Sequence, residues 1–148
     1  MEFGRIQSVL VATSIGDVVY ERFYDKFSDL EKADIRAAFY STTEPYLQYL
    51  TDGAEYAARF KSAAVVARTE GDLFFYALGS GEYDELSLSE VIDVIFQSLR
   101  DVLKRQPSEG LLWDNYGKLC LLIDEIVNEG VIDATDREAI QRGIRLKE

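Results

Sequence analysis

The sequence contains no histidine, and this absence excludes several kinds of enzyme. Histidine is the commonest general base near neutral pH and the most frequent nitrogen ligand of metal ions. The single cysteine, Cys120, excludes an internal disulfide and a zinc site built from two or four cysteines, and its apolar neighbours predict a buried, unreactive thiol. The phosphate-holding patterns GxxxxGK[ST] and GxGxxG are also missing. We therefore expect a protein that is not an enzyme and that binds neither a metal nor a cofactor.

Positive charge is scarce as well. The chain has 16 Lys and Arg residues against 27 Asp and Glu residues, which gives a net charge of −11. This charge opposes binding to nucleic acids and to anionic lipid surfaces, so we expect protein partners, preferably basic ones. Apolar runs are only a few residues long, and the first residues, MEFGRIQ, show no signal-peptide pattern. We expect a cytosolic chain that does not insert into a membrane by itself.

A length of 148 residues predicts one domain, spanning residues 1–148. Two apolar, β-rich runs within residues 5–24 flank the short link at residues 14–17, which is typical of a β-hairpin. About three more strands are expected within residues 55–79. Their runs are apolar on both faces, so helices should cover both sides of the sheet.

Capping boxes predict where helices begin. In this pattern a Ser or Thr side chain and a Glu three residues later satisfy each other's free amide groups. Three such pairs precede expected helices, namely Ser28 with Glu31, Ser87 with Glu90, and Thr135 with Glu138.

Proline and glycine predict where helices end. Pro45 should break the first helix after Thr43, and Pro107 should end the second. Ser108 can cap a further helix, for which Gly130 is a suitable C′ residue. The core stripe of that helix is expected to contain Leu112, Tyr116, Leu119, Cys120, Ile123, Ile126 and Val127. The order of the elements predicts an α+β fold with an antiparallel sheet of about five strands between helices.

The only candidates for chemistry are the acidic residues near the end of this third helix. Neighbours Asp124 and Glu125 point about 100° apart on a helix, so they do not converge on one substrate. Acidic groups in a last helical turn face the negative end of the helix dipole, which is unfavourable by roughly 0.3–1 kcal/mol each. We therefore expect a Lys or Arg residue of a partner protein to compensate these carboxylates.

A line of residues displaced from the core stripe points to an interface. Trp113, Gly117 and Leu121 follow at i, i+4 and i+8, and Asp124, Glu125 and Asn128 continue the line. A helical glycine costs about 1 kcal/mol against alanine and is commonly kept where another chain approaches closely. Tryptophan is enriched at interfaces. The alternative is that this helix is buried on two sides within its own domain.

Four stretches form a recognisable pattern, namely residues 72–76 with 79–80, residues 84–86, residues 96–99, and residues 122–127 with 130–132. In these stretches the chain resembles the longin-domain (SNARE-like) small subunits of vesicle coats, most of all coatomer zeta. Residues 27–36 depart from the zeta pattern, and the chain is also similar to the longin-like small subunit of the TSET coat, called the TPLATE complex in plants. The resemblance implies a longin fold and a non-catalytic role in endocytic transport at the plasma membrane. The alternatives are coatomer zeta in Golgi–ER transport and a free longin adaptor that binds a small GTPase.

The resemblance also implies partners and a second site. Small chains of this kind are held by the helical-solenoid trunk of a large coat subunit, beside other coat subunits, and reach membranes only through the complex. Related adaptor chains bind acidic dileucine sorting signals, and the corresponding positions here are Leu73, Phe96 and Leu111. Phe96 is bulkier than that pocket would tolerate, and Glu109 nearby disfavours an acidic peptide.

Overall fold

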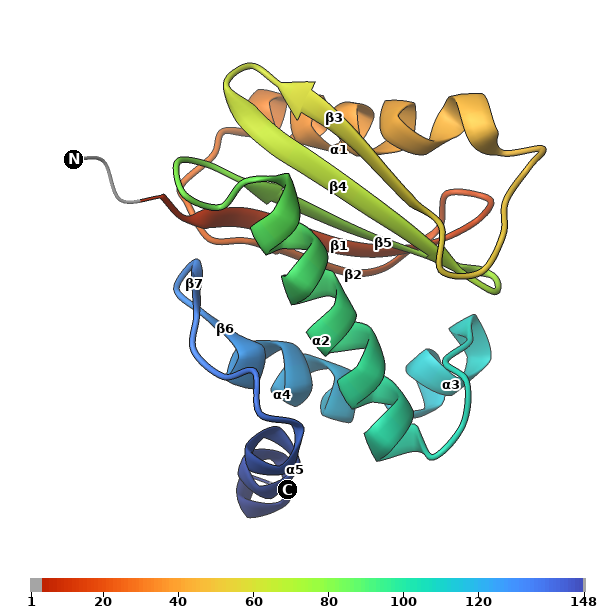
Figure 1. Ribbon diagram of the computed structural model, residues 1–148, viewed down its shortest axis with the longest axis vertical. Coiled ribbons are helices and arrows are strands. Elements are labelled where there is room, and N and C mark those ends of the chain that lie inside the picture. The colour runs from red at the N-terminus through yellow and green to blue at the C-terminus, as the bar shows by residue number, and fades with distance from the viewer. Residues whose placement is uncertain (1–3, 148) are drawn as a thin grey trace.

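The computed structural model describes residues 4–147 as a five-stranded antiparallel sheet with helices on both faces (Figure 1). The strands are β1 (Ile6–Thr13), β2 (Val18–Phe23), β3 (Glu55–Phe60), β4 (Ala63–Glu70) and β5 (Leu73–Gly79). Their order across the sheet is β2-β1-β5-β4-β3. The predicted α+β class and sheet are confirmed. The first three residues of MEFGRIQ and the last residue of the predicted domain 1–148 lie outside the described residues.

The N-terminal hairpin and the first helix form as the sequence predicts. β1 and β2 pair in antiparallel register, with Val11 opposite Tyr20. The capping box is complete: the Glu31 amide donates to Ser28 Oγ at 3.1 Å, and the Ser28 amide donates to Glu31 Oε1 at 3.0 Å. Helix α1 (Asp29–Thr43) ends two residues before Pro45, which lies inside the 3₁₀ turn η1 (Glu44–Tyr46). The chain thereby passes over one face, from β2 at one edge to β3 at the other.

Each face of the sheet has its own hydrophobic core, because successive side chains of a strand point to opposite faces. Helix α1 covers one face, and α2 (Glu85–Leu103) and α4 (Tyr116–Ile126) cover the other (Figure 1). The α1 face buries Leu10, Ile35, Phe39, Val65, Phe74, Tyr76 and Leu78. The opposite face buries Val9, Val11, Val66, Phe75, Ile92, Ile95, Leu122, Ile123 and Ile126. The prediction that helices cover both sides is confirmed.

Helix α2 begins earlier than its capping-box pattern predicts. Its N-cap is Asp84, whose Oδ1 accepts a hydrogen bond from the Ser87 amide at 3.0 Å. The predicted cap, Ser87, lies inside the helix and donates its hydroxyl to the Glu82 carbonyl. Asp and Ser cap equally well, so the upstream Asp starts the helix first. The helix ends at Leu103, before Pro107 as predicted.

The single long helix predicted after Ser108 is wrong, because the chain forms two helices there. Helix α3 (Glu109–Asp114) is capped by Ser108 as expected, and its last residue is separated from α4 by Asn115. The backbone of Asn115 is not helical (φ −125°, ψ 33°), and its side-chain Nδ2 donates to the Leu111 carbonyl at 2.9 Å. The Asn115 side chain thus makes a local hydrogen bond to the backbone that competes with the hydrogen bonds of a continuous helix.

The new helix break also corrects the predicted core stripe. Tyr116, expected inside, is 40% exposed at the first position of α4. Leu122, which the stripe omitted, is fully buried. Cys120 is half-buried rather than buried, and it packs against the core beneath α2 and α4.

Gly130 does not end a helix, which corrects its predicted C′ role. It lies with Glu129 in the two-residue turn between β6 (Val127–Asn128) and β7 (Val131–Ile132). Both turn residues have positive φ, 51° for Glu129 and 82° for Gly130, as a type I′ hairpin turn requires. The Gly130 carbonyl accepts from the Ile6 amide at 2.6 Å, so this small hairpin is anchored to β1.

The last helix, α5 (Arg137–Lys147), is capped one residue later than predicted. Asp136 Oδ1 accepts from the Glu138 amide at 3.0 Å, and the predicted box with Thr135 does not form. The Asp side chain follows Thr135 directly and reaches the same free amides. Ile140 and Ile144 of α5 are buried in the core that α2 and α4 share.

Candidate functional site

The predicted interface residues do not form one continuous helical line. Trp113 belongs to α3, whereas Gly117 and Leu121 belong to α4 beyond the break at Asn115. Leu121 is half-buried and packs against the core, which fits the alternative that this side is partly internal. The line predicted from helical spacing is therefore corrected, and its members divide into two groups.

The first group, Trp113 and Gly117, belongs to an exposed aromatic surface that also includes Tyr116, called here the α3–α4 surface. Trp113 is 49% exposed, and its ring stacks on Tyr116 with centroids 5.8 Å apart and planes 24° apart. Gly117 is exposed, and a Cβ atom built there would meet no atom of the described chain within 4 Å. Space beside the glycine is open, and the neighbouring rings offer a flat apolar contact.

The second group is the acidic end of α4, and here the expectation of unpaired carboxylates is wrong. Asp124 Oδ1 accepts from Arg22 Nη1 of β2 at 2.6 Å. Glu125 forms an ion pair with Lys147 at the end of α5. Two elements remote in sequence therefore compensate the charges that face the helix dipole. Asn128, the last member of the predicted line, is exposed in β6.

The surroundings of this acidic end raise the pKa values of three ionisable side chains. Burial, reinforced by the Asp124 carboxylate, raises the pKa of Tyr20 from 10.0 to about 12. Burial also raises the pKa of Tyr24 above its ordinary range. The hydrogen bond to Glu125 raises the pKa of Lys147. At neutral pH the tyrosines are therefore uncharged and the lysine is charged.

The three positions that correspond to a dileucine pocket are largely filled by the protein's own side chains. Leu73 is fully buried and Phe96 is 2% exposed, while Leu111 is half-buried. The Phe96 ring packs edge-to-face on Phe75, with centroids 5.8 Å apart. The Arg68 guanidinium lies over the ring of Phe96, 4.7 Å from its centroid. A leucine from a ligand would have to displace this packing.

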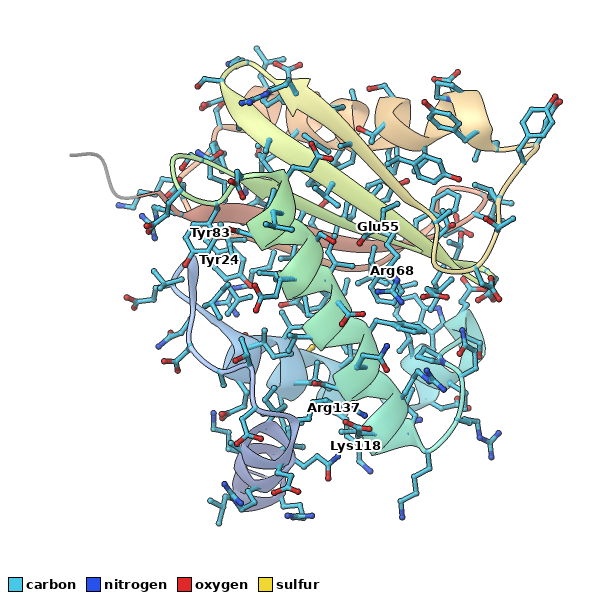
Figure 2. All side chains as sticks on the ribbon, in the orientation of Figure 1. Tyr24, Glu55, Arg68, Tyr83, Lys118 and Arg137 are labelled. Carbon is cyan, nitrogen blue, oxygen red and sulfur yellow. The ribbon has the colours of Figure 1, made fainter. Side chains whose placement is uncertain are left out.

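Arg68 forms a polar connection between sheet and helix that local sequence patterns did not reveal. Its guanidinium donates to Glu70 at 2.8 Å and to Asp93 of α2 at 2.6 Å. Glu55 of β3 accepts from the hydroxyl of Ser89 on α2 at 2.7 Å. Figure 2 shows Glu55 and Arg68 on the α2 side of the sheet. A signal existed in the alternating Arg-Thr-Glu at the end of β4, which puts two opposite charges on one face.

Within residues 4–147, no group of three or more Cys, Asp and Glu side chains is arranged to hold a metal ion. None of the helices in this part of the chain has the length and apolar content needed to cross a membrane. Of the predicted interface residues, Trp113 and Gly117 lie on the exposed α3–α4 surface.

Comparison with known proteins places these features in a family. Residues 5–148 match the family described as clathrin adaptor complex small chain. The chain is 29% identical over 143 residues to the TSET complex member tstD of Dictyostelium discoideum, covering 96% of this chain and 93% of that one. It is 28% identical over 144 residues to coatomer subunit zeta-1 of Homo sapiens, covering 96% of this chain and 77% of the relative.

Among solved structures, the chain resembles one in a homology model of the full-length AP-3 complex in a stretched open conformation. The TM-score is 0.64 at 15% identity, and the match covers 96% of this chain and 92% of the other. This likeness confirms the predicted longin-type fold of an adaptor small subunit. With 144 of its 148 residues matched by the family, the chain belongs to the clathrin adaptor complex small chains.

Proposed function

We propose that this chain is a non-catalytic small subunit of a heteromeric vesicle coat of the TSET type, folded as a single longin-like domain over residues 1–148. The observation that carries the proposal is the match to tstD, which extends over 93% of that relative. The match to coatomer zeta-1 leaves almost a quarter of that protein uncovered, since it spans 77% of it. A coatomer role at the Golgi is therefore the second candidate, and a free longin adaptor for a small GTPase is the third.

The proposed partners are a large helical-solenoid subunit and the other subunits of the same coat. In this arrangement the chain works in the cytoplasm and reaches the membrane only through the complex, with the plasma membrane favoured. The net charge of −11 supports a basic partner, because opposite fields accelerate encounter.

The α3–α4 surface is the proposed contact with the large subunit. Trp113 and Tyr116 present stacked rings that the free chain leaves about half exposed, at 49% and 40%. Exposed aromatic side chains of this size contribute strongly when a partner covers them. The open space beside Gly117 allows a partner's backbone to approach α4 closely. The acidic end of α4, with Asp124, Glu125 and Asn128, lies further along the same helix and adjoining hairpin.

Purification of the tagged chain from its native cells under mild salt tests the assembly. A large helical-repeat protein should be recovered in stoichiometric amount, together with further coat subunits. Recovery of the chain alone as a monomer would refute the coat role. Recovery of a small GTPase without any large subunit would favour the third candidate instead.

Gly117→Ala tests the proposed contact surface. Because a methyl group meets no atom of the described chain at this position, the free domain should gain about 0.5–1 kcal/mol of stability from the better helix former. Binding to the recovered large subunit should nevertheless weaken. Stronger or unchanged binding would show that no backbone approaches the glycine.

A further inference from the structure

A hollow lies on the opposite face of the sheet from α2 and α4, and the proposed assembly does not use it. It opens between the β1–β2 turn and the C-terminal end of α1, which lie at the same end of the sheet (Figure 1). Its volume is about 390 Å³, within the range of small binding sites in proteins. Phe74 and Tyr76 of β5 line it, with Ile15 of the turn and Leu47 after η1.

The floor of this hollow is fixed before any ligand arrives. The hydroxyls of Tyr76 and Thr43 share a buried hydrogen bond of 2.8 Å. The Tyr76 ring stacks on Phe39 with centroids 5.2 Å apart. Pro45, in the η1 turn, restricts the backbone that carries Leu47. A site whose lining is already ordered loses little conformational entropy on binding.

The rim, in contrast, exposes apolar side chains that the fold does not use. Ile15 is 84% exposed and Leu47 is 45% exposed. Tyr49, two residues after Leu47, lies outside the lining and is 76% exposed. A pocket rimmed by large exposed apolar side chains marks a contact site more often than scattered surface residues do.

Charge identifies the kind of partner. Among the described residues that line the hollow, Glu44 carries the only charge. The lining comes from residues 13–16, 40–47 and 74–76, and none of these three stretches contains a Lys or Arg. The turn that carries Ile15 also contains Asp17, and the Ser14 amide donates to the carbonyl of Asp72 in the adjoining turn at 3.0 Å. The surroundings of the hollow are therefore apolar and acidic.

We propose that this hollow binds an extended segment of a partner protein in which one or two large apolar side chains are flanked by Lys or Arg. The apolar side chains fill the space between Ile15 and Leu47, and the basic flanks face Glu44 and Asp17. A second copy of this chain is disfavoured because two molecules with a net charge of −11 repel each other. An anionic membrane is repelled by the same acidic rim.

This binding site goes beyond the proposed function, since it lies on the α1 face and the α3–α4 surface lies on helices of the other face. The two hypotheses therefore fail separately. A variant of this chain that no longer binds the peptide should still co-purify with the large subunit.

Binding of synthetic peptides to the full-length chain tests the proposal. Three fluorescein-labelled peptides of about ten residues share one Gly/Ser frame. The first carries two adjacent leucines flanked by two arginines on each side, the second has glutamates in place of the arginines, and the third has serines in place of the leucines. Fluorescence polarisation should show binding of the first peptide only, weakened when NaCl rises from about 50 mM to about 500 mM.

Two variants and a matched control locate the site. Leu47→Glu and Ile15→Glu should each weaken binding of the first peptide roughly tenfold or more. Leu86→Glu changes a leucine of similar exposure, 80%, at the start of α2, and it should leave binding unchanged. Because Ile15 is 84% exposed, its variant remains folded, which circular dichroism verifies.

Several results would overturn the proposal. Equal binding of the basic and acidic peptides would refute the argument from charge. If Leu86→Glu weakened binding of the first peptide as much as Leu47→Glu and Ile15→Glu do, the peptide would not bind at this hollow. A concentration-dependent dimer that Ile15→Glu abolishes would assign the hollow to a second copy. Binding to vesicles that contain anionic lipid, lost in Leu47→Glu, would assign it to a membrane. Failure of the first peptide to bind the free chain would refute it outright.

Discussion

Replacing Trp113 by alanine separates the stability of the free chain from its assembly. In the free chain the indole is 49% exposed and stacks on Tyr116. Loss of such an aromatic pair costs about 0.5–1.5 kcal/mol, and loss of the half-buried apolar area adds about 1 kcal/mol. A domain of this size has a stability of roughly 5–15 kcal/mol, so Trp113→Ala should stay folded.

The effect on assembly should be larger than a comparable surface change produces. Truncating a buried aromatic anchor of an interface typically costs about 2 kcal/mol or more, which is roughly a thirtyfold rise in Kd. Titration of the purified large subunit by calorimetry measures this change, and urea unfolding of the free chain measures stability. Tyr49→Ala is the control, because that ring is 76% exposed and lies after η1 on the α1 face.

The tryptophan also provides a direct probe, since it is the only one in the chain. Fluorotryptophan labelling gives one NMR resonance, which should shift and broaden when the large subunit covers the ring. An affinity for Trp113→Ala within about threefold of the parent, with this resonance unmoved by the large subunit, would refute the assignment of the α3–α4 surface.

Three further changes test the fold that positions these surfaces. Arg68→Ala leaves the carboxylate of Glu70, 5% exposed, without its buried partner, and urea unfolding should show a loss of roughly 3–5 kcal/mol; an added Glu70→Gln should recover part of it. Tyr76 has its pKa raised by burial from 10.0 to about 12, so the unfolded chain releases this proton first and its contribution to stability should fall by about 2 kcal/mol as pH rises from 10 to 12; Tyr76→Phe should flatten that decline, and an unchanged slope would contradict the pKa. Gly130→Ala puts a Cβ atom 2.7 Å from the Ile6 carbonyl oxygen at a φ of 82°, so thermal unfolding should show a loss of at least about 1–3 kcal/mol, and a neutral result would refute the strain.

Local patterns predicted the order of strands and helices well, because most of the relevant signals lie within a few residues. The link at residues 14–17 and the pair Ser28 and Glu31 formed as expected. Asp84 displaced Ser87 as a cap because several residues in one stretch can accept from the same free amides, and the pattern does not rank them. The errors at helix starts are therefore small shifts rather than wrong elements.

The break at Asn115 was harder to predict because apolar spacing continues across it. Leu112 and Leu119, on either side of the break, are both buried, so periodicity alone suggested one helix. The Asn115 side chain donates a hydrogen bond to the Leu111 carbonyl and thereby competes with the backbone hydrogen bonds of a continuous helix. Amino-acid composition does not predict which of the two wins. Likewise, Gly130 was expected as a C′ residue, but it lies in a hairpin turn whose carbonyl accepts from the amide of Ile6, more than a hundred residues away in sequence.

The acidic end of α4 shows why a site is less predictable than a fold. Its carboxylates are compensated by Arg22 and Lys147, and no local pattern connects these residues to Asp124 and Glu125. Long-range pairs form only when the tertiary structure brings distant elements together. The sequence left open whether Trp113 is exposed or buried within the domain, and the structure shows that it is 49% exposed.

These internal pairs change how the net charge acts on assembly. Arg22 and Lys147 are neutralised within the chain, as are Arg36 by Glu21 and Arg137 by Asp101, so the excess of acidic groups is what a partner meets. Attraction of a basic partner then depends on the summed field rather than on one carboxylate, and it should govern the association rate and its salt dependence. A change such as Glu125→Lys first breaks the contact with α5, since Lys147 lies against that carboxylate. Its effect on assembly would mix a displaced helix with a lost charge, whereas Trp113→Ala removes no charge and no ion pair of the chain.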